Sequence, residues 1–349
     1  MKKIPVVIVG AGNVANGMHL PAWKKIPEVE VVAVCDTNRE YAERTAEKWK
    51  VPKVYTNFDE LLEEEQKGMI IDLCTPPATH APLSIKAMKA GFNVVLEKPM
   101  AMSIEESEKI LREHQKRKEE VKLCVIHNYL FNPSMLKIKS ILEKEKVEVL
   151  GVDIRMLHTP NDEMISSKNH WVHSLPGGRF GECLIHPVYL LQNLLGKLDI
   201  RDVYVAKRGS YDWVKYDELH AIFSSDEKVG SIYISFNSPR ETSFPTMRVY
   251  GKNLILNFDG TNSTLTIQKY MDTRSKIKRA KDSLSISMQI LKSTAGNAFK
   301  VMTDKWKLGH ENLFRLFVDS ILKGKEMPYT PEEAFEANKT FLEVLERLP

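Results

Sequence analysis

The first 126 residues alternate short apolar segments with segments of helical character, and this pattern restricts the fold more than any other feature of the 349-residue chain. The apolar runs cover residues 4–9, 29–34, 69–75, 94–96 and 121–126. Strands and helices that alternate in this way form a parallel sheet with helices on both faces. Because such strands are buried on both sides, they consist of continuous apolar runs. We therefore predict an α/β fold that begins with a doubly wound parallel sheet.

A glycine-rich loop follows the first predicted strand. Residues 10–15 read GAGNVA, which is a G-x-G-x-x-A pattern between a strand and a helix. Gly10 allows the tight turn, Gly12 lets the backbone approach a pyrophosphate, and the final alanine permits close packing of helix on strand. The phosphates would rest on the helix N-terminus. The loop therefore predicts a Rossmann domain in which Gly10, Gly12, Asn13 and Val14 bind a dinucleotide.

An acidic residue ends the second predicted strand. Asp36 lies about two dozen residues after the glycines, where a carboxylate suits hydrogen bonding to an adenosine ribose. This position favours NAD. Asn38 and Arg39 follow closely and could receive a 2′-phosphate, so NADP stays an alternative. Asp36 could instead cap the helix that begins near Arg39.

Two further loops should lie on the same edge of the sheet, where open α/β sheets bind ligands. The strand at 94–96 ends in a carboxylate, an ammonium and a proline, and burying a lysine without a partner or a task costs several kcal/mol. A surface lysine is the alternative. We predict that the residues of these two loops that flank the dinucleotide are Thr75, Pro76, His80, Glu97 and Lys98.

The pattern changes after residue 126. Longer strand-like segments at 147–157, 201–206, 219–224 and 228–236 are followed by further strands joined by short turns, which is typical of an antiparallel sheet. We predict a Rossmann domain at 1–126 and an α+β domain at 127–349 with a mainly antiparallel open sheet, whose C-terminal helix could pack back on the first domain. A sister subunit commonly covers such a sheet, so we expect a homodimer or homotetramer formed through it.

A second group of polar residues lies inside this domain. Glu182 and His186 are four positions apart in a predicted helix, so they should share one face, and the carboxylate could orient an imidazole that acts as acid or base. A satisfied helix histidine is the alternative. Upstream, Trp171 and His173 occupy a polar aromatic loop suited to a sugar ring, or to solvent.

A lysine-rich segment at 279–306 has an apolar stripe at helical spacing. It could lie on a membrane surface or bind a partner, but packing on its own domain or across a subunit interface is the commoner outcome. The stripe consists of Leu284, Met288, Leu291, Ala295, Ala298, Met302 and Trp306.

Composition narrows the function. A net charge of +4 argues against nucleic-acid binding, and the absence of a long apolar run or signal peptide predicts a cytoplasmic protein without membrane attachment. The four cysteines are widely spaced without a C-x-x-C pair, so we expect reduced thiols and no metal site. The four are Cys35, Cys74, Cys124 and Cys183.

The order of these motifs resembles the Gfo/Idh/MocA oxidoreductase family, which includes glucose-fructose oxidoreductase, inositol dehydrogenase and nucleotide-sugar dehydrogenases. The resemblance covers nearly the whole chain, and the E-K-P tripeptide is its most specific mark. The matching motifs are residues 10–15, Thr75-Pro76-Pro77 with His80, Glu97-Lys98-Pro99, Gly177-Gly178 and Glu182 four before His186.

The resemblance implies NAD(P)-dependent oxidation of a secondary alcohol on a sugar, cyclitol or nucleotide sugar. Lys98 would hydrogen-bond the reacting hydroxyl, His186 would accept its proton, and the Lys98–Pro99 peptide bond would be cis. Asn128, at the end of the last strand of the first sheet, is a candidate substrate ligand. An NAD-dependent glycoside hydrolase and a non-catalytic dinucleotide-binding regulator are the alternatives.

Three residues depart from the family pattern. Glu182 stands where aspartate is usual, and Tyr189 stands where an aspartate often follows the histidine. Arg179 replaces a frequent third glycine, and a guanidinium facing the site could pair with a carboxylate or phosphate. We therefore list Arg179 and Tyr189 among the substrate contacts and raise the hypothesis of an anionic substrate.

Overall fold

The structure is a computed structural model that describes residues 3–242, 244–269, 274–303 and 309–349. The chain forms two compact units, each described here by itself. The first contains Met1–Phe131 and Leu308–Leu342, and the second contains Asn132–Lys307 and Glu343–Pro349. The expected division placed residues 127–349 in the second domain and allowed the C-terminal helix to pack back on the first, and here residues 309–342 belong with the first unit.

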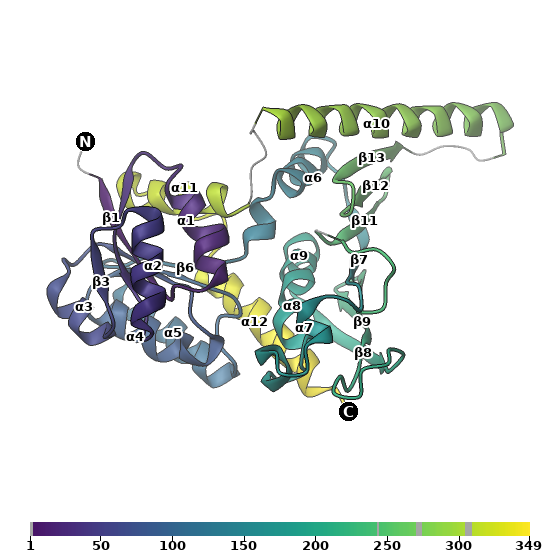
Figure 1. Cartoon of the computed structure of the whole chain (residues 1–349). Helices are drawn as coiled ribbons and strands as arrows, with labels where there is room; N and C mark the ends of the chain where they lie inside the picture. Colours follow the sequence, from purple (N-terminus) through teal and green to yellow (C-terminus); the bar gives the residue numbers. More distant parts are fainter. Residues whose placement is uncertain (1–2, 243, 270–273, 304–308) are drawn as a thin grey trace. The chain divides into compact units, whose positions relative to one another are not determined.

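The sheet of the first unit has six strands, all parallel (Figure 1). The strand order reverses between β1 and β4, and the loops after these two strands therefore face the crevice where open sheets bind ligands. The predicted α/β fold is confirmed. In spatial order the strands are β3 (Lys53–Tyr55), β2 (Val29–Cys35), β1 (Ile4–Val9), β4 (Ile70–Leu73), β5 (Asn93–Leu96) and β6 (Leu123–Val125).

Three helices of this unit, α2, α3 and α5, begin after residues whose side chains cap them. At the start of α5, Ser103 accepts a hydrogen bond from the Glu106 backbone N–H, as the S-x-x-E sequence of residues 103–106 favours. The helical segments are η1 (a π-helix, Ala15–His19), α1 (Leu20–Trp23), α2 (Arg39–Trp49), α3 (Phe58–Glu64), η2 (Pro77–Thr79), α4 (His80–Lys89), α5 (Ile104–Arg117), η3 (Asn128–Phe131), α11 (Gly309–Lys323) and α12 (Pro331–Glu346).

C-terminal helices complete the core of the first unit. Phe314 of α11 stacks on Trp23 of α1 with ring centroids 4.1 Å apart, and both side chains are fully buried. The side chain of Asn338 in α12 accepts a hydrogen bond from the Met100 N–H and donates to the Ala101 carbonyl. These contacts explain why residues 308–342 belong with the N-terminal sheet.

The second unit contains a seven-stranded sheet in which every neighbouring pair is antiparallel except β7 and β10 (Figure 1). The prediction of a mainly antiparallel α+β domain is therefore confirmed. In spatial order the strands are β13 (Thr264–Lys269), β12 (Leu254–Asp259), β11 (Thr246–Gly251), β7 (Val149–Leu157), β10 (Lys228–Ser235), β9 (Glu218–Ser225) and β8 (Asp199–Ala206).

One helix packs tightly on this sheet. A Cβ added to Gly230 on β10 would lie 2.9 Å from Leu191 and Leu195 of α9, so the glycine allows the close approach. Among the described residues, no helix is both long and apolar enough to cross a membrane. The helical segments of this unit are α6 (Pro133–Lys144), α7 (Glu163–Ser166), η4 (Trp171–Ser174), α8 (Phe180–Cys183), α9 (Ile185–Leu195) and α10 (Lys276–Met302).

Candidate active site

The glycine loop has the backbone that its sequence predicts. Gly10 has φ +94°, and a Cβ there would lie 2.6 Å from the Cys74 carbonyl oxygen, so only glycine fits without a shift. A Cβ at Gly12 would meet no atom within 4 Å, which leaves room for a ligand beside the backbone. Asn13 and Val14 are exposed at the start of the helix, whereas Ala15 is fully buried.

Asp36 is tied to the glycine loop. Its carboxylate accepts hydrogen bonds from the Ala11 N–H at 2.8 Å and from the Asn38 N–H at 2.8 Å. Asn38 itself caps α2, accepting from the Tyr41 N–H, so Asp36 is not the cap residue. Arg39 is exposed and pairs with Glu43, one turn along the same helix.

His80 braces the loop after β4. It is fully buried, and its two ring nitrogens lie 2.7 Å from the Pro99 carbonyl oxygen and 2.9 Å from that of Thr75. Burial is the main cause that lowers the pKa of His80. Since protein carbonyls occupy both nitrogens, His80 holds the Thr75 loop against the loop that carries Lys98. Pro76 is exposed beside it.

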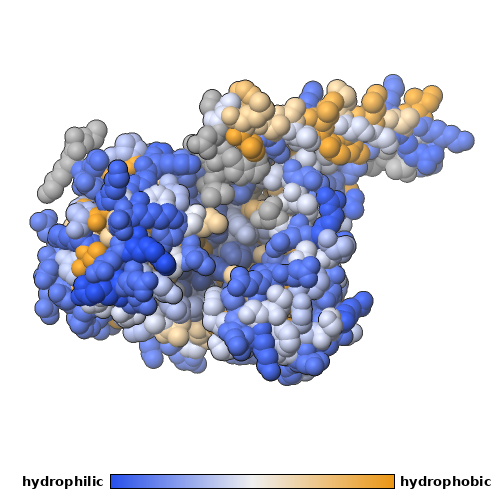
Figure 2. Space-filling model, in the orientation of Figure 1, coloured by the Kyte–Doolittle hydropathy of each residue, from blue (hydrophilic) through white to orange (hydrophobic). Residues whose placement is uncertain are grey.

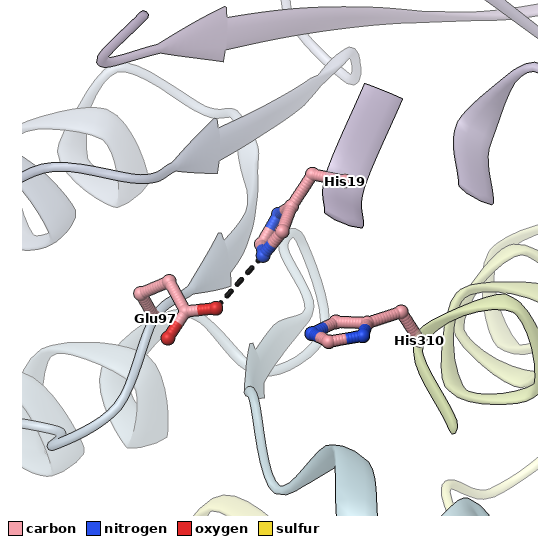
Figure 3. Close-up of side chains that lie close together, drawn as sticks. All are labelled: His19, Glu97 and His310. Carbon is pink, nitrogen blue, oxygen red and sulfur yellow. Dashed lines mark hydrogen bonds and ion pairs between the residues drawn. The ribbon is translucent and has the colours of Figure 1, made fainter. Parts of the chain in front are cut away.

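Glu97 belongs to a buried network. Its Oε1 lies 2.8 Å from His19 Nε2, and its Oε2 accepts the Lys98 backbone N–H at 2.9 Å (Figure 3). On the other side of the imidazole, Nδ1 lies 2.9 Å from Asp72 Oδ2, which also accepts the Trp23 indole N–H. The carboxylate of Glu97 is therefore positioned by the protein, and it holds the backbone from which Lys98 projects.

The charges in this network stabilise one another. Burial lowers the pKa of His19, but Asp72 raises it further, so the pKa lies well above its ordinary value and the ring is an imidazolium. Burial raises the pKa of Glu97, yet the hydrogen bond and charge of His19 outweigh it and bring that pKa to about 2. His19 thus donates its Nδ1–H to Asp72 and its Nε2–H to Glu97, two buried carboxylates.

His310 of α11 completes the cluster (Figure 3). Its ring centroid is 5.2 Å from that of His19, and burial together with the His19 charge lowers its pKa to about 3. The ligand atoms of His19, Glu97 and His310 lie within 4.8 Å of one another, close enough to share a cation. Such an ion would have to displace the protons that His19 gives to Asp72 and Glu97. That the chemistry uses no metal stays a prediction.

Lys98 and Asn128 both follow strands at the C-terminal edge of the first sheet. Lys98 is half-buried after β5, and its peptide bond to Pro99 is cis, as predicted. Asn128 is half-buried after β6, the strand that pairs with β5. This edge also carries the glycine loop and Thr75, so the first unit gathers all of its predicted site residues at one side.

In the second unit, Arg179 is almost fully buried among acids. One guanidinium nitrogen pairs with Glu182, and another lies 3.2 Å from Asp162. Two carboxylates therefore neutralise this cation, which argues against a role in binding an anionic substrate. Gly177 and Gly178 precede it with φ +71° and +60°.

His186 lies on α9 with a tyrosine as its partner. Its Nδ1 is 2.9 Å from the Tyr189 hydroxyl oxygen, and both residues are buried. The predicted continuous helix through Glu182 and His186 is wrong, because α8 ends at Cys183 and α9 begins at Ile185. The orientation of His186 by Glu182 stays a prediction, and the observed partner of Nδ1 is the Tyr189 hydroxyl at the i, i+3 spacing.

The aromatic loop is short and partly helical. Trp171 lies in η4 and is 49% exposed, so a ligand could contact its indole ring. His173 is half-buried, and its Nε2 lies 3.0 Å from the Ser167 carbonyl oxygen. This contact fixes the loop.

Several site residues escaped sequence analysis. His19 and Asp72 lie within apolar segments, and His310 has no local motif. His158, beside Glu241 at 3.2 Å in the second unit, is similar. Asp72 could have been found from the sequence, because it is a charged residue inside the apolar run of β4.

Comparison with known proteins supports the assignment of the first unit. Residues 4–126 match the model of an oxidoreductase family, GFO_IDH_MocA, with an NAD-binding Rossmann fold. Oxidoreductase P35 of Formosa agariphila is 27% identical over 271 residues, covering 75% of this chain and 81% of that protein. The uncharacterized oxidoreductase YrbE of Bacillus subtilis is 23% identical over 343 residues, covering 97% and 92%.

The similarity to solved structures includes the second unit as well as the first. The WlbA dehydrogenase of Bordetella pertussis, solved in complex with NADH and UDP-GlcNAcA, superposes with a TM-score of 0.79 at 19% identity, covering 99% of this chain and 95% of that one. The glycine loop and the reversal of strand order between β1 and β4 agree with the match of residues 4–126 to an NAD-binding Rossmann fold. Residues 4–126 therefore match the NAD-binding Rossmann domain of the Gfo/Idh/MocA oxidoreductase family.

Proposed function

We propose that the protein is an NAD-dependent dehydrogenase that oxidises a secondary alcohol of a sugar, cyclitol or nucleotide sugar. The observation that carries this proposal is the position of Lys98. It leaves the C-terminal edge of the Rossmann sheet directly after a carboxylate that His19 and the backbone hold in place. A cation at this edge, beside the glycine loop, suits the stabilisation of a developing alkoxide.

The cofactor site is proposed at residues 10–15, Asp36 and the Thr75 loop. Gly12 would face the pyrophosphate, since its Cα is open on the side where a Cβ would lie. Asp36 would accept hydrogen bonds from the ribose hydroxyls while it keeps its bond to the Ala11 N–H. When bound, NAD supplies the acceptor for a hydride.

The reaction removes a hydride from the carbon and a proton from the oxygen of the alcohol, which leaves a ketone. As the C–H bond breaks and its electron pair leaves with the hydrogen, the hydroxyl must lose a proton for the carbonyl to form. Lys98 would donate a hydrogen bond to the alcohol oxygen and stabilise its negative charge. His186 would take the proton at Nε2, with its Nδ1 oriented by the Tyr189 hydroxyl.

The substrate class rests on similarity. WlbA, a structural neighbour with the same two-part fold, was solved with a nucleotide sugar. In this chain, Trp171 is exposed and suits stacking on a sugar ring, and Asn128 would hydrogen-bond a hydroxyl. Because Asp162 and Glu182 neutralise Arg179, this guanidinium does not favour a sugar acid over a neutral sugar ring.

A substrate screen and one matched pair of variants test the proposal. Neutral sugars, cyclitols, sugar acids and nucleotide sugars are incubated with NAD or NADP, and formation of the reduced cofactor is followed by fluorescence. With the best substrate, Lys98→Met should lower kcat at least about 100-fold while NAD affinity is retained. Lys89→Met, an exposed lysine of α4, is the control and should leave kcat unchanged.

Full turnover by the Lys98→Met enzyme would reject the catalytic role of this lysine. Tight NAD binding with no turnover of any compound would instead indicate a regulator. Cleavage of a glycoside without net accumulation of NADH would indicate a hydrolase.

A further inference from the structure

The long helix α10 turns its polar side toward its own domain. The Gln289 amide donates to the Ile267 carbonyl at 3.1 Å and accepts the Ile267 N–H at 2.8 Å, which satisfies both backbone groups of this residue on the edge strand β13. Asn297 donates to the Ser263 carbonyl at 2.9 Å. These side chains replace a neighbouring strand, so α10 is held to the sheet edge by hydrogen bonds.

The opposite side of α10 is apolar and exposed. None of the 27 residues of the helix is buried, and Leu284, Leu291 and Met302 are 65%, 61% and 84% exposed. Figure 2 shows hydrophobic residues gathered along this helix. We define the α10 stripe as Leu284, Met288, Leu291, Ala295, Ala298 and Met302. Trp306, which the sequence pattern added to it, lies outside the described residues.

The spacing of the stripe indicates a helix as its partner. Its members are separated by four, three, four, three and four positions, which is the alternation of a coiled-coil seam, and Ile277 lies one heptad before Leu284. In heptad terms, the residues that face the sheet, such as Gln289 and Ser293, lie on the side away from the seam. Ile290, Phe299 and Val301 of α10 are also exposed outside the stripe, so a lipid surface is the alternative that the vesicle experiment below tests.

We propose that the α10 stripe pairs with α10 of a second copy of this chain in an antiparallel two-helix contact. A two-fold axis midway between Gln289 and Ile290 places each Leu284 opposite Ala295 and each Met288 opposite Leu291. Leucine then faces alanine at one level and methionine faces leucine at the next, while Met302 lies opposite Ile277 and Ala298 opposite Lys281. The helix is about 40 Å long at 1.5 Å per residue, which provides more than three heptads of contact.

The charge distribution selects the antiparallel direction. The first six positions of the helix contain four basic residues, Lys276, Lys278, Arg279 and Lys281. The other 21 positions contain two basic residues, Lys292 and Lys300. A parallel pair would place the two basic ends side by side, where like charges repel. An antiparallel pair puts them at opposite ends, well beyond a screening length of about 8 Å.

The test measures the mass of the full-length chain by light scattering after gel filtration. The double variant Leu284→Glu/Leu291→Glu should halve the mass of the wild-type assembly, because two carboxylates per chain would be buried in the seam. Ser283→Glu adds a carboxylate at an exposed position of the same helix outside the stripe and should leave the mass unchanged. Circular dichroism and NAD binding establish that both variants are folded.

A mixing experiment tests the direction. The variant Met288→Lys/Ala295→Lys should also fail to associate alone, yet its mixture with Leu284→Glu/Leu291→Glu should restore the wild-type mass. In an antiparallel pair, Leu291→Glu then faces Met288→Lys, and Leu284→Glu faces Ala295→Lys.

Three results would overturn the proposal. The first is a wild-type protein that is monomeric at tens of micromolar. The second is a seam variant that is folded and keeps the wild-type mass. The third is flotation of the wild type with phosphatidylserine vesicles that the seam variant loses without any change in mass, which would assign the stripe to a membrane surface.

Discussion

His19 Nε2 lies 2.8 Å from Glu97 Oε1, although 78 positions separate the two residues in the chain. The imidazole also bonds Asp72, so one proton-bearing ring joins the helix after the glycine loop to the ends of β4 and β5. The two loops proposed to hold cofactor and to present Lys98 are therefore fixed to each other by a buried charge network.

Replacing the centre of this network should destabilise the protein strongly. His19→Leu leaves Asp72 and Glu97 as buried carboxylates without their counterion, which should lower the free energy of unfolding by roughly 3–5 kcal/mol. Urea denaturation measures it. The double variant His19→Leu/Glu97→Gln should recover part of the loss, since the second change neutralises one carboxylate. A loss below about 1 kcal/mol for His19→Leu would show that the network contributes little.

Stability should fall in mild acid because of His310. Its pKa is depressed to about 3 in the folded protein, whereas in the unfolded chain it returns to the ordinary 6.5. Below pH 6.5 the unfolded chain therefore binds a proton that the folded chain does not, and stability decreases as the pH falls toward 3. The loss by pH 4.5 should be about 2–3 kcal/mol from this group.

The variant His310→Leu isolates this contribution. Urea denaturation at pH 7.0 and at pH 4.5 gives the free energy of unfolding at each pH. The decrease between the two pH values should be smaller in the variant than in the wild type. Glu97 does not interfere, since its pKa of about 2 preserves its contribution above pH 4.5 and removes it only in stronger acid. An unchanged difference would mean that His310 titrates normally.

The two glycines of the cofactor loop should respond differently to alanine. Gly10→Ala places a Cβ 2.6 Å from the Cys74 carbonyl oxygen at positive φ, so it should destabilise the fold by about 1–3 kcal/mol. Gly12→Ala meets no atom and should leave the melting temperature unchanged while weakening NAD binding at least tenfold. Calorimetry measures both quantities, and equal melting temperatures for the two variants would contradict this reading.

Asp36 should determine the choice of dinucleotide. Asp36→Ala removes the proposed ribose acceptor and should weaken NAD binding about tenfold, a loss of about 1.4 kcal/mol. NADP binding should change less, because its 2′-phosphate would no longer face a carboxylate. Titration with each cofactor gives the two dissociation constants, and their ratio measures the preference for NAD over NADP. Glu40→Ala, an exposed acid in the first turn of α2, serves as the control and should preserve it.

Tyr189 should affect turnover without affecting the cofactor. Tyr189→Phe removes the hydroxyl that lies 2.9 Å from His186 Nδ1, and kcat should fall about tenfold with an unchanged KM for NAD. Tyr204→Phe on exposed strand β8 is the control. Equal kcat values in both variants would remove Tyr189 from the proposed proton path.

Local patterns in the sequence were sufficient to predict much of the secondary structure and the division into two domains. The strand, glycine loop and helix at residues 4–19 follow from apolar runs and from two glycines, because these preferences act over a few residues. The two-domain organisation followed from a change of pattern near residue 126. The E-K-P tripeptide indicated the family and its cis Lys98–Pro99 bond.

Tertiary structure alone decided the partners of the buried charges and the direction of α10. His19 meets Asp72 and Glu97 across 53 and 78 positions, a pairing that no local preference encodes. The stripe in the sequence indicated an amphipathic helix that packs on its own domain or across a subunit interface, and the structure shows that its apolar side is exposed within the single chain. The open edge of β13 needs hydrogen-bond partners, and the polar side of α10 supplies them, which leaves the apolar side outward.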